Sequence, residues 1–283
     1  MSAIRLRSTI TTTVGFLVNA TSCHKIGNRK AGFRVTRSNL KTQCVDSPFY
    51  TTRLALPPDY ENVVDFMCEV YYKGEPIIHN IGLKGTEAPE SWRRMMYDQV
   101  RSGLSIIAED RDHCIIGAAL NSVIGPSEPK NLCEFARICE STPIRRIVEF
   151  YSYIAQKLNV WERYCSWQVF EQSSLAVHTA FQGLGIARRL VGESWFLARD
   201  CSYPLFLIHC NSSYCAKICE RNGWQMIWSI PFDQYVYDGE VVFKHVKEPH
   251  TMCKVFVDQL KICKPYCKTT KKCNKVTYPP KIN

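Results

Sequence analysis

The chain has 283 residues and a net charge of +10, from 36 Lys and Arg against 26 Asp and Glu. It has no run of 18 apolar residues, so we expect no membrane-spanning helix. Residues 1–45 hold eight Lys and Arg, and residues 261–283 hold seven Lys, with no acid in either, which leaves 21 basic residues against 26 acids in 46–260. An acidic body argues against a groove that binds nucleic-acid phosphates and suits a cationic ligand.

The two ends also differ in composition from the rest of the chain, which predicts three segments. Residues 1–45 form a basic, acid-free leader rich in Arg, Ser and Thr, either a mitochondrial transit peptide or a disordered extension. Residues 46–260 form the folded domain, and residues 261–283 form a Lys- and Cys-rich tail. We expect a cytoplasmic location, with mitochondrial import as the alternative if the leader is a transit peptide.

The 15 cysteines are odd in number and irregularly spaced, which favours reduced thiols inside a cell over a disulfide framework. In the tail, Cys263, Cys267 and Cys273 lack the second ligand pair of the usual zinc motifs. We therefore expect no metal.

Hydrophobic periodicity and turn residues predict the elements of the first half of the domain. They are a strand over 49–56, a helix over 57–74, a helix over 91–100, a hairpin of 104–109 and 114–124, and helices over 131–140 and 144–157. Pro76 bars a continuing helix, so Glu75 is expected in irregular structure at a helix end.

The second half is predicted to alternate strands and helices before it ends in strands. The expected elements are a strand over 168–177, a helix from 187, a strand over 203–210, a helix over 212–221, and strands over 225–230, 241–245 and 252–260. Together the two halves predict an α+β fold with a mixed sheet.

The turn Gln182-Gly-Leu-Gly-Ile-Ala187 joins the end of a strand directly to a helix. Such a turn leaves several backbone N–H groups unpaired beside the positive end of the helix dipole, which makes a site for an anion such as pyrophosphate. Gly183 and Gly185 let the backbone approach that ligand closely. No Gly-Lys-Ser/Thr follows and a third glycine is missing, so this is neither a P-loop nor a dinucleotide fingerprint.

Read as Gln182-x-x-Gly185-x-Ala187 after Leu-Ala-Val-His, this segment resembles the acyl-CoA loop of the GNAT superfamily of N-acyltransferases. Further landmarks over residues 49–260 resemble the insect-type arylalkylamine (dopamine-like) N-acetyltransferases. They are Glu75-Pro76, Asn159-Val-Trp-Glu-Arg-Tyr164, Glu220-Arg-Asn-Gly-Trp224, Ile230-Pro-Phe-Asp-Gln-Tyr235 and Glu248-Pro-His250.

The resemblance implies a GNAT-like α+β (α/β) fold, with a mixed, mostly antiparallel central sheet flanked by helices and a splayed central strand pair. It implies a monomer that transfers the acetyl group of acetyl-CoA to the primary amine of a small arylalkylamine such as dopamine, serotonin or tryptamine, by direct attack in a ternary complex. Polyamine acceptors, longer acyl donors and a CoA-binding protein without turnover remain alternatives. A nucleic-acid or membrane-surface binder would use only the Lys-rich ends, because the body is acidic.

The resemblance also implies which residues hold acetyl-CoA. The pantetheine would pair with backbone near Leu175 and Val177, and the pyrophosphate would contact the amides from Gly183 to Arg188. The implied cofactor-binding residues are Leu175, Ala176, Val177, Gln182, Gly183, Leu184, Gly185, Ile186, Ala187 and Arg188.

The implied chemistry needs a base, because alkyl ammonium groups lose their proton only near about pH 10. Glu75 matches the family's proposed base, although Gly74 stands where that branch usually has an acid; Glu171 on the central strand is the runner-up. For the acid that protonates the leaving thiolate, Cys219 aligns with a position where many GNAT enzymes have Tyr, and Cys215 with one where the insect branch often has Ser.

Overall fold

The computed structural model describes residues 49–83 and 85–260. The chain divides into two units, Met1–Gln43 and Cys44–Asn283, and every described residue belongs to the second. The expected leader over 1–45 and the expected tail over 261–283 lie outside the described residues. The three-segment division therefore stays a prediction.

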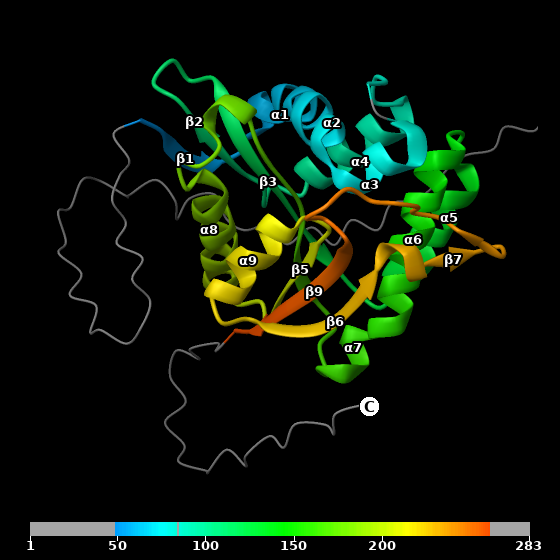
Figure 1. Ribbon diagram of the computed structural model, residues 1–283. Helices are drawn as coiled ribbons and strands as arrows, with labels where there is room; N and C mark the ends of the chain where they lie inside the picture. Colours follow the sequence, from blue (N-terminus) through cyan, green and yellow to red (C-terminus); the bar gives the residue numbers. More distant parts are fainter. Residues whose placement is uncertain (1–48, 84, 261–283) are drawn as a thin grey trace, which may run out of the picture. The chain divides into compact units, whose positions relative to one another are not determined.

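Seven strands form one sheet in the order β1-β2-β3-β4-β5-β9-β6 (Figure 1). They are β1 (Thr51–Leu54), β2 (Ile106–Glu109), β3 (Ile115–Ile124), β4 (Val169–Val177), β5 (Leu205–Cys210), β6 (Gln225–Pro231) and β9 (Met252–Gln259). Neighbouring strands pair antiparallel except β4 and β5, which are parallel. The expected mixed, mostly antiparallel sheet is confirmed.

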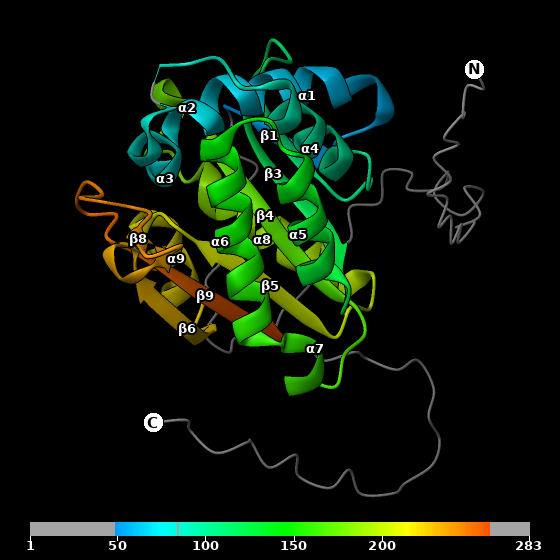
Figure 2. The same ribbon diagram turned by 90° about the vertical axis from the view of Figure 1, so that its right-hand side faces the viewer.

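Helices cover both faces of the sheet (Figures 1 and 2). The α-helices are α1 (Tyr60–Phe66), α2 (Tyr72–Gly74), α3 (Pro76–Ile78), α4 (Glu90–Val100), α5 (Glu128–Ile138), α6 (Thr142–Leu158), α7 (Val160–Arg163), α8 (Ile186–Asp200) and α9 (Ser213–Arg221). Short 3-10 turns are η1 (Pro57–Asp59), η4 (Thr179–Phe181) and η5 (Phe232–Gln234), and π-helical turns are η2 (Met67–Tyr71) and η3 (His79–Leu83). None of these helices is long and apolar enough to cross a membrane.

The side chains of β5 alternate between two hydrophobic clusters, as the period of a strand requires. Leu205 and Leu207 pack in the cluster formed with α1, α4, α5 and α6. Phe206, Ile208 and Cys210 pack in the cluster that lies under α8 and α9. The sheet therefore has an α6 face and an α8/α9 face.

The parallel pair β4 and β5 separates toward its carboxyl ends. Its ladder ends at Gln172 and Ile208, whereas β4 runs on to Val177 and β5 to Cys210. The expected splayed central pair is confirmed, and it opens the sheet between its two faces.

The expected strand over 241–245 is wrong. Only Val241 is in a strand, in the small hairpin of β7 (Val236–Tyr237) and β8 (Glu240–Val241). Val242 and Phe243 are apolar because they are buried, and Phe243 lies 5.1 Å, centroid to centroid, from Phe150 of α6. An apolar run can thus fill an aromatic core without pairing in a sheet.

Two smaller differences concern helices. The segment before β4 is the one-turn helix α7, and the chain after Glu75 resumes as the short helix α3, because proline is well suited to the first helical position.

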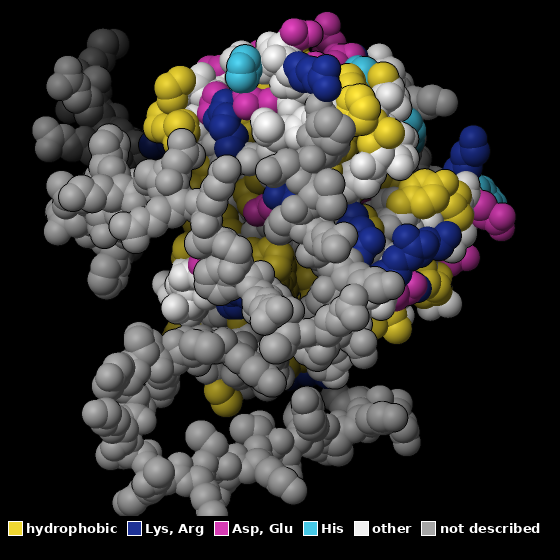
Figure 3. Space-filling view, turned by 90° about the vertical axis from the view of Figure 1, so that its left-hand side faces the viewer, with side chains coloured by type: hydrophobic (Ala, Val, Ile, Leu, Met, Phe, Trp, Pro, Cys, Tyr) yellow, Lys and Arg dark blue, Asp and Glu magenta, His cyan; other side chains and the backbone are white. Residues whose placement is uncertain are grey.

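Figure 3, which faces the α8 side, shows acidic and basic side chains close to one another on the described surface. This fits the presence of both signs of charge, 21 basic and 26 acidic residues, in 46–260.

Candidate active site

The glycine turn before α8 has the geometry of an anion cradle. Gly183 has φ +83° and Gly185, the N-cap of α8, has φ +82°. A Cβ at either position would meet no atom within 4 Å, so the space above the backbone is open. Residues 182–185 are exposed, and the first amides of a helix have no acceptor within it. The turn fits a phosphate group.

The ten residues expected to bind the cofactor are contiguous in space along the end of β4 and the start of α8. Beyond Gln172 the β4 edge that faces β5 carries no ladder, so Leu175 and Val177 have backbone available on that side. Gln182 donates its amide Nε2 to the Val177 carbonyl at 3.3 Å, which ties the turn to the strand. Ile186 is buried in the core, so only its backbone could contact a ligand.

Glu75 lies at the break between α2 and α3 and is 6% exposed. Its Oε2 accepts hydrogen bonds from the backbone N–H of Ile77 at 2.6 Å and of Ile78 at 3.4 Å. The carboxylate therefore caps the short helix that Pro76 begins. The expectation that Glu75 lies at a helix end is confirmed, and its burial distinguishes it from a solvent-exposed loop carboxylate.

Asn211, directly after β5, joins Glu75 to two tyrosines of the α6 face. Its Nδ2 donates to Glu75 Oε1 at 2.8 Å and to the Tyr151 hydroxyl at 2.7 Å. The Asn211 Oδ1 is buried and has no hydrogen-bond partner among the described residues. Tyr71 lies within hydrogen-bonding reach of Tyr151 and Ser174. The network holds the carboxylate and presents an acceptor beside it.

Burial raises the pKa of Glu75 to about 7, although the hydrogen bonds from Asn211, Ile77 and Ile78 partly oppose this. A carboxylate with that pKa is half-ionised near neutral pH and can both accept and return a proton. Burial also raises the pKa of Tyr71 and of Tyr151, so both phenols stay protonated.

A stability prediction follows from the Glu75 pKa. The folded-state pKa of about 7 exceeds the ordinary 4.5, so the folded protein holds a proton there that the unfolded chain releases. Stability is therefore lost as pH rises from 4.5 through 7, in total about 3 kcal/mol. Glu75→Gln should raise the Tm by several degrees at pH 8 and change it much less at pH 5, as measured by calorimetry. An equal shift at both pH values would contradict it, and Glu134→Gln on the α5 surface is the matched control.

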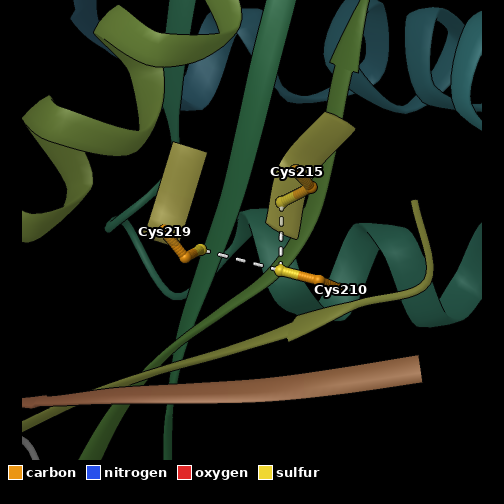
Figure 4. A group of neighbouring side chains, drawn as sticks. All are labelled: Cys210, Cys215 and Cys219. Carbon is orange, nitrogen blue, oxygen red and sulfur yellow. Dashed lines mark hydrogen bonds between the residues drawn. The ribbon is translucent and has the colours of Figure 1, made fainter. Parts of the chain in front are cut away.

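The two cysteines expected as acids lie on α9, on the other face of the sheet, together with Cys210 at the end of β5 (Figure 4). Cys210 Sγ is 3.4 Å from Cys215 Sγ and 3.7 Å from Cys219 Sγ. Burial raises the pKa of Cys210, whereas hydrogen bonds from the neighbouring thiols lower the pKa of Cys215. Cys215 is half-buried, whereas Cys210 and Cys219 are buried.

Glu171, the runner-up base, also lies on the α6 face. Its Oε1 lies 2.9 Å from Nδ1 of His209 on β5. Both residues line a cavity with Glu128, Tyr71 and Tyr151, and the remaining walls are mostly apolar. Burial, and then the charge of Glu171, raise the pKa of Glu128 to about 7. Among the described residues no hydrogen bond joins Glu171 to Glu75 or Asn211, although the two tyrosines of that network line the same cavity.

Sequence reasoning missed Asn211, Tyr71, Tyr151, Glu128 and His209. Tyr71 had a usable signal, because it lies four residues before Glu75 on the helix that ends there. The others had none, since their roles depend on contacts between distant elements. The ring of His79 hydrogen-bonds to the Lys73 carbonyl, and His178 caps η4 by accepting from the Ala180 amide. The roles of the predicted site residues stay predictions.

No family model matches the chain. Among solved structures it is similar to mosquito arylalkylamine N-acetyltransferase like 5b, with a TM-score of 0.70 and 22% identity over 75% of this chain and 100% of that one. For the Drosophila melanogaster polyamine N-acetyltransferase the TM-score is 0.68 and the identity 22%, over 75% of this chain and 100% of that one. For arylalkylamine N-acetyltransferase 2 from Aedes aegypti the TM-score is 0.70 and the identity 19%, over 75% of this chain and 99% of that one. The chain has the fold of these proteins, and the expected GNAT fold is confirmed.

Proposed function

We propose that this protein is an acetyl-CoA-dependent N-acetyltransferase that acts on the primary amine of a small arylalkylamine such as tryptamine or dopamine. The observation that carries the proposal is a juxtaposition at one edge of the sheet. Because β4 and β5 are parallel, the glycine turn after β4 and Asn211 after β5 lie at the same edge. An anion cradle and a buried carboxylate with a pKa of about 7 thus flank the splayed strands.

In this proposal the end of β4 and the turn over 182–188 hold the cosubstrate. The open space above Gly183 and Gly185 and the exposed amides fit its pyrophosphate, and the unpaired β4 edge fits its amide-containing arm. Acetyl-CoA supplies the thioester that is attacked. These neighbours of similar fold are named as N-acetyltransferases, which agrees with the proposal.

The protein's own contribution is to prepare the amine. Glu75 accepts a proton from the substrate ammonium, directly or through a water molecule, so that a neutral amine can attack. Asn211 orients that carboxylate through Nδ2, while its Oδ1 can accept an N–H of the same amine. Protonation of the departing thiolate falls to Cys219 or to a phenol of the network, Tyr71 or Tyr151, since the lowered pKa of Cys215 makes that thiol the poorer donor.

The test is release of CoA thiol from acetyl-CoA in the presence of tryptamine, dopamine or spermidine. We expect amine-dependent release with a product that mass spectrometry identifies as the N-acetylamine. Binding of CoA without release for any of these amines would instead support a CoA-binding protein without turnover.

A second candidate substrate class is an amine with another positive charge, such as a diamine. The cavity beside Tyr71 and Tyr151 contains Glu128, Glu171 and His209 and has no Lys or Arg in its described lining. If His209 donates Nδ1–H to Glu171, its buried Nε2, which has no partner among the described residues, is also an acceptor. Two carboxylates in a cavity without Lys or Arg among its described lining favour a cationic group there.

This candidate predicts a change in selectivity. Glu128→Gln should lower kcat/KM for a diamine such as putrescine roughly tenfold or more relative to tryptamine, since a charged hydrogen bond contributes about 1.5–3 kcal/mol. Steady-state assays with both amines measure the ratio. Glu134→Gln, exposed on the same helix, is the control and should leave the ratio unchanged. If the ratio of kcat/KM for putrescine to that for tryptamine is unchanged in Glu128→Gln, the proposal of a diamine substrate is contradicted.

A further inference from the structure

Three thiols converge where β5 passes into α9 (Figure 4). They lie on the α8/α9 face of the sheet, opposite the Glu75 network. The Sγ atoms of Cys210, Cys215 and Cys219 all lie within 4.8 Å of one another, and none of the three forms a disulfide. They come from the last residue of a strand and from two successive turns of a helix, so regular backbone structure fixes all three. The positions of the three thiols are therefore set by a strand and a helix and not by loops.

The spacing of the sulfurs matches metal coordination. Zinc–sulfur bonds of about 2.3 Å at tetrahedral angles put the sulfurs roughly 3.8 Å apart. The separations of 3.4 Å and 3.7 Å from Cys210 and the limit of 4.8 Å for the group are close to that value. Small side-chain shifts would let one ion contact all three sulfurs.

The surroundings favour a soft cation. Cys210 and Cys219 are 1% and 0% exposed among apolar side chains, and no oxygen ligand belongs to the group among the described residues. Thiolate ligands select soft or borderline ions over Mg²⁺ or Ca²⁺. The first turns of α9, whose N-cap is Ser212, place the positive end of a helix dipole beside the sulfurs. Half-buried Cys215 leaves one side of the cluster accessible.

We propose that Cys210, Cys215 and Cys219 form a three-thiolate site for a cation of the Zn²⁺ and Cd²⁺ class, with water in the fourth position. Binding exchanges the remaining S–H bonds for metal–sulfur bonds and releases their protons to solvent; no electron is transferred. The binding does not depend on the proposed function.

The test titrates the reduced, full-length chain with Cd²⁺ and follows the thiolate-to-cadmium charge-transfer absorption in the ultraviolet. We expect one equivalent of this signal to be lost in Cys219→Ser and in Cys215→Ser. Cys253→Ser, a buried cysteine outside the cluster, should keep it. The triple variant Cys263→Ser, Cys267→Ser, Cys273→Ser should keep it too, which separates the cluster from the tail cysteines.

Differential alkylation of the unmutated chain keeps the proposal testable if a serine variant fails to fold. Cd²⁺ should protect the peptides that carry Cys210, Cys215 and Cys219 from iodoacetamide in partly unfolding conditions. Absence of the absorption, its survival in both cluster variants, or protection confined to the tail cysteines would overturn the site. Metal binding in a chain that acetylates no amine would refute the proposed function and leave the site intact.

Discussion

Glu75→Gln should bind acetyl-CoA as the unmutated chain does and lower kcat with tryptamine by about 10²–10⁴, the usual span for losing a general base. The glutamine can still accept the backbone N–H groups of Ile77 and Ile78, so the start of α3 is kept. Only the ability to take a proton from the substrate is lost. Steady-state kinetics with calorimetry of CoA binding separates the two effects.

The pH dependence makes the Glu75 assignment specific. In the unmutated chain kcat/KM should rise with pH through about 7, because the base works only when ionised and its pKa lies there. The limb should disappear in Glu75→Gln, because the group that titrates is absent. An unchanged limb would mean that another group, such as Glu128, titrates in the profile.

Glu171→Gln is the contrasting variant. Glu171 pairs with His209, and among the described residues no hydrogen bond joins it to Glu75 or Asn211, so its loss should lower kcat with tryptamine much less than loss of Glu75 does. If Glu171→Gln abolished turnover and Glu75→Gln left it near that of the unmutated chain, the base would lie on the central strand.

Gly185→Val should weaken CoA binding roughly tenfold or more, which corresponds to at least about 1.4 kcal/mol. Gly185 has φ +82°, where a β-branched residue is strained, and its side chain would enter the open space above the amides. The KM for acetyl-CoA should rise with it. Isothermal calorimetry with CoA measures the affinity directly.

The control for this variant is Gly192→Ala on the same helix. Gly192 has no positive φ, and a Cβ there meets nothing within 4 Å, so the substitution should leave CoA affinity unchanged. Unchanged affinity in Gly185→Val would show that the turn does not hold the cofactor.

Much of the fold followed from local patterns in the sequence. Proline and glycine mark the ends of helices because they fix or free single backbone angles, and this located Glu75 and the turn over 182–187 correctly. Periodicity located the strands that lie in the main sheet. It failed at 241–245, where Phe243 is apolar for aromatic packing against Phe150 rather than for pairing. An apolar run in the sequence indicates burial, but it does not show whether the side chains pack within a sheet or against a helix.

What the sequence by itself determined is the order of elements, the anion-binding turn and the carboxylate at a helix break, because each depends on neighbours within a few residues. Only the tertiary structure decided what surrounds them. Asn211 reaches Glu75 across 136 positions, and the parallel register of β4 and β5 sets Glu171 beside His209. Such contacts arise from sheet register and helix packing, which sum over the whole domain, so no local pattern records them. The buried setting that raises the pKa of Glu75 is of the same kind.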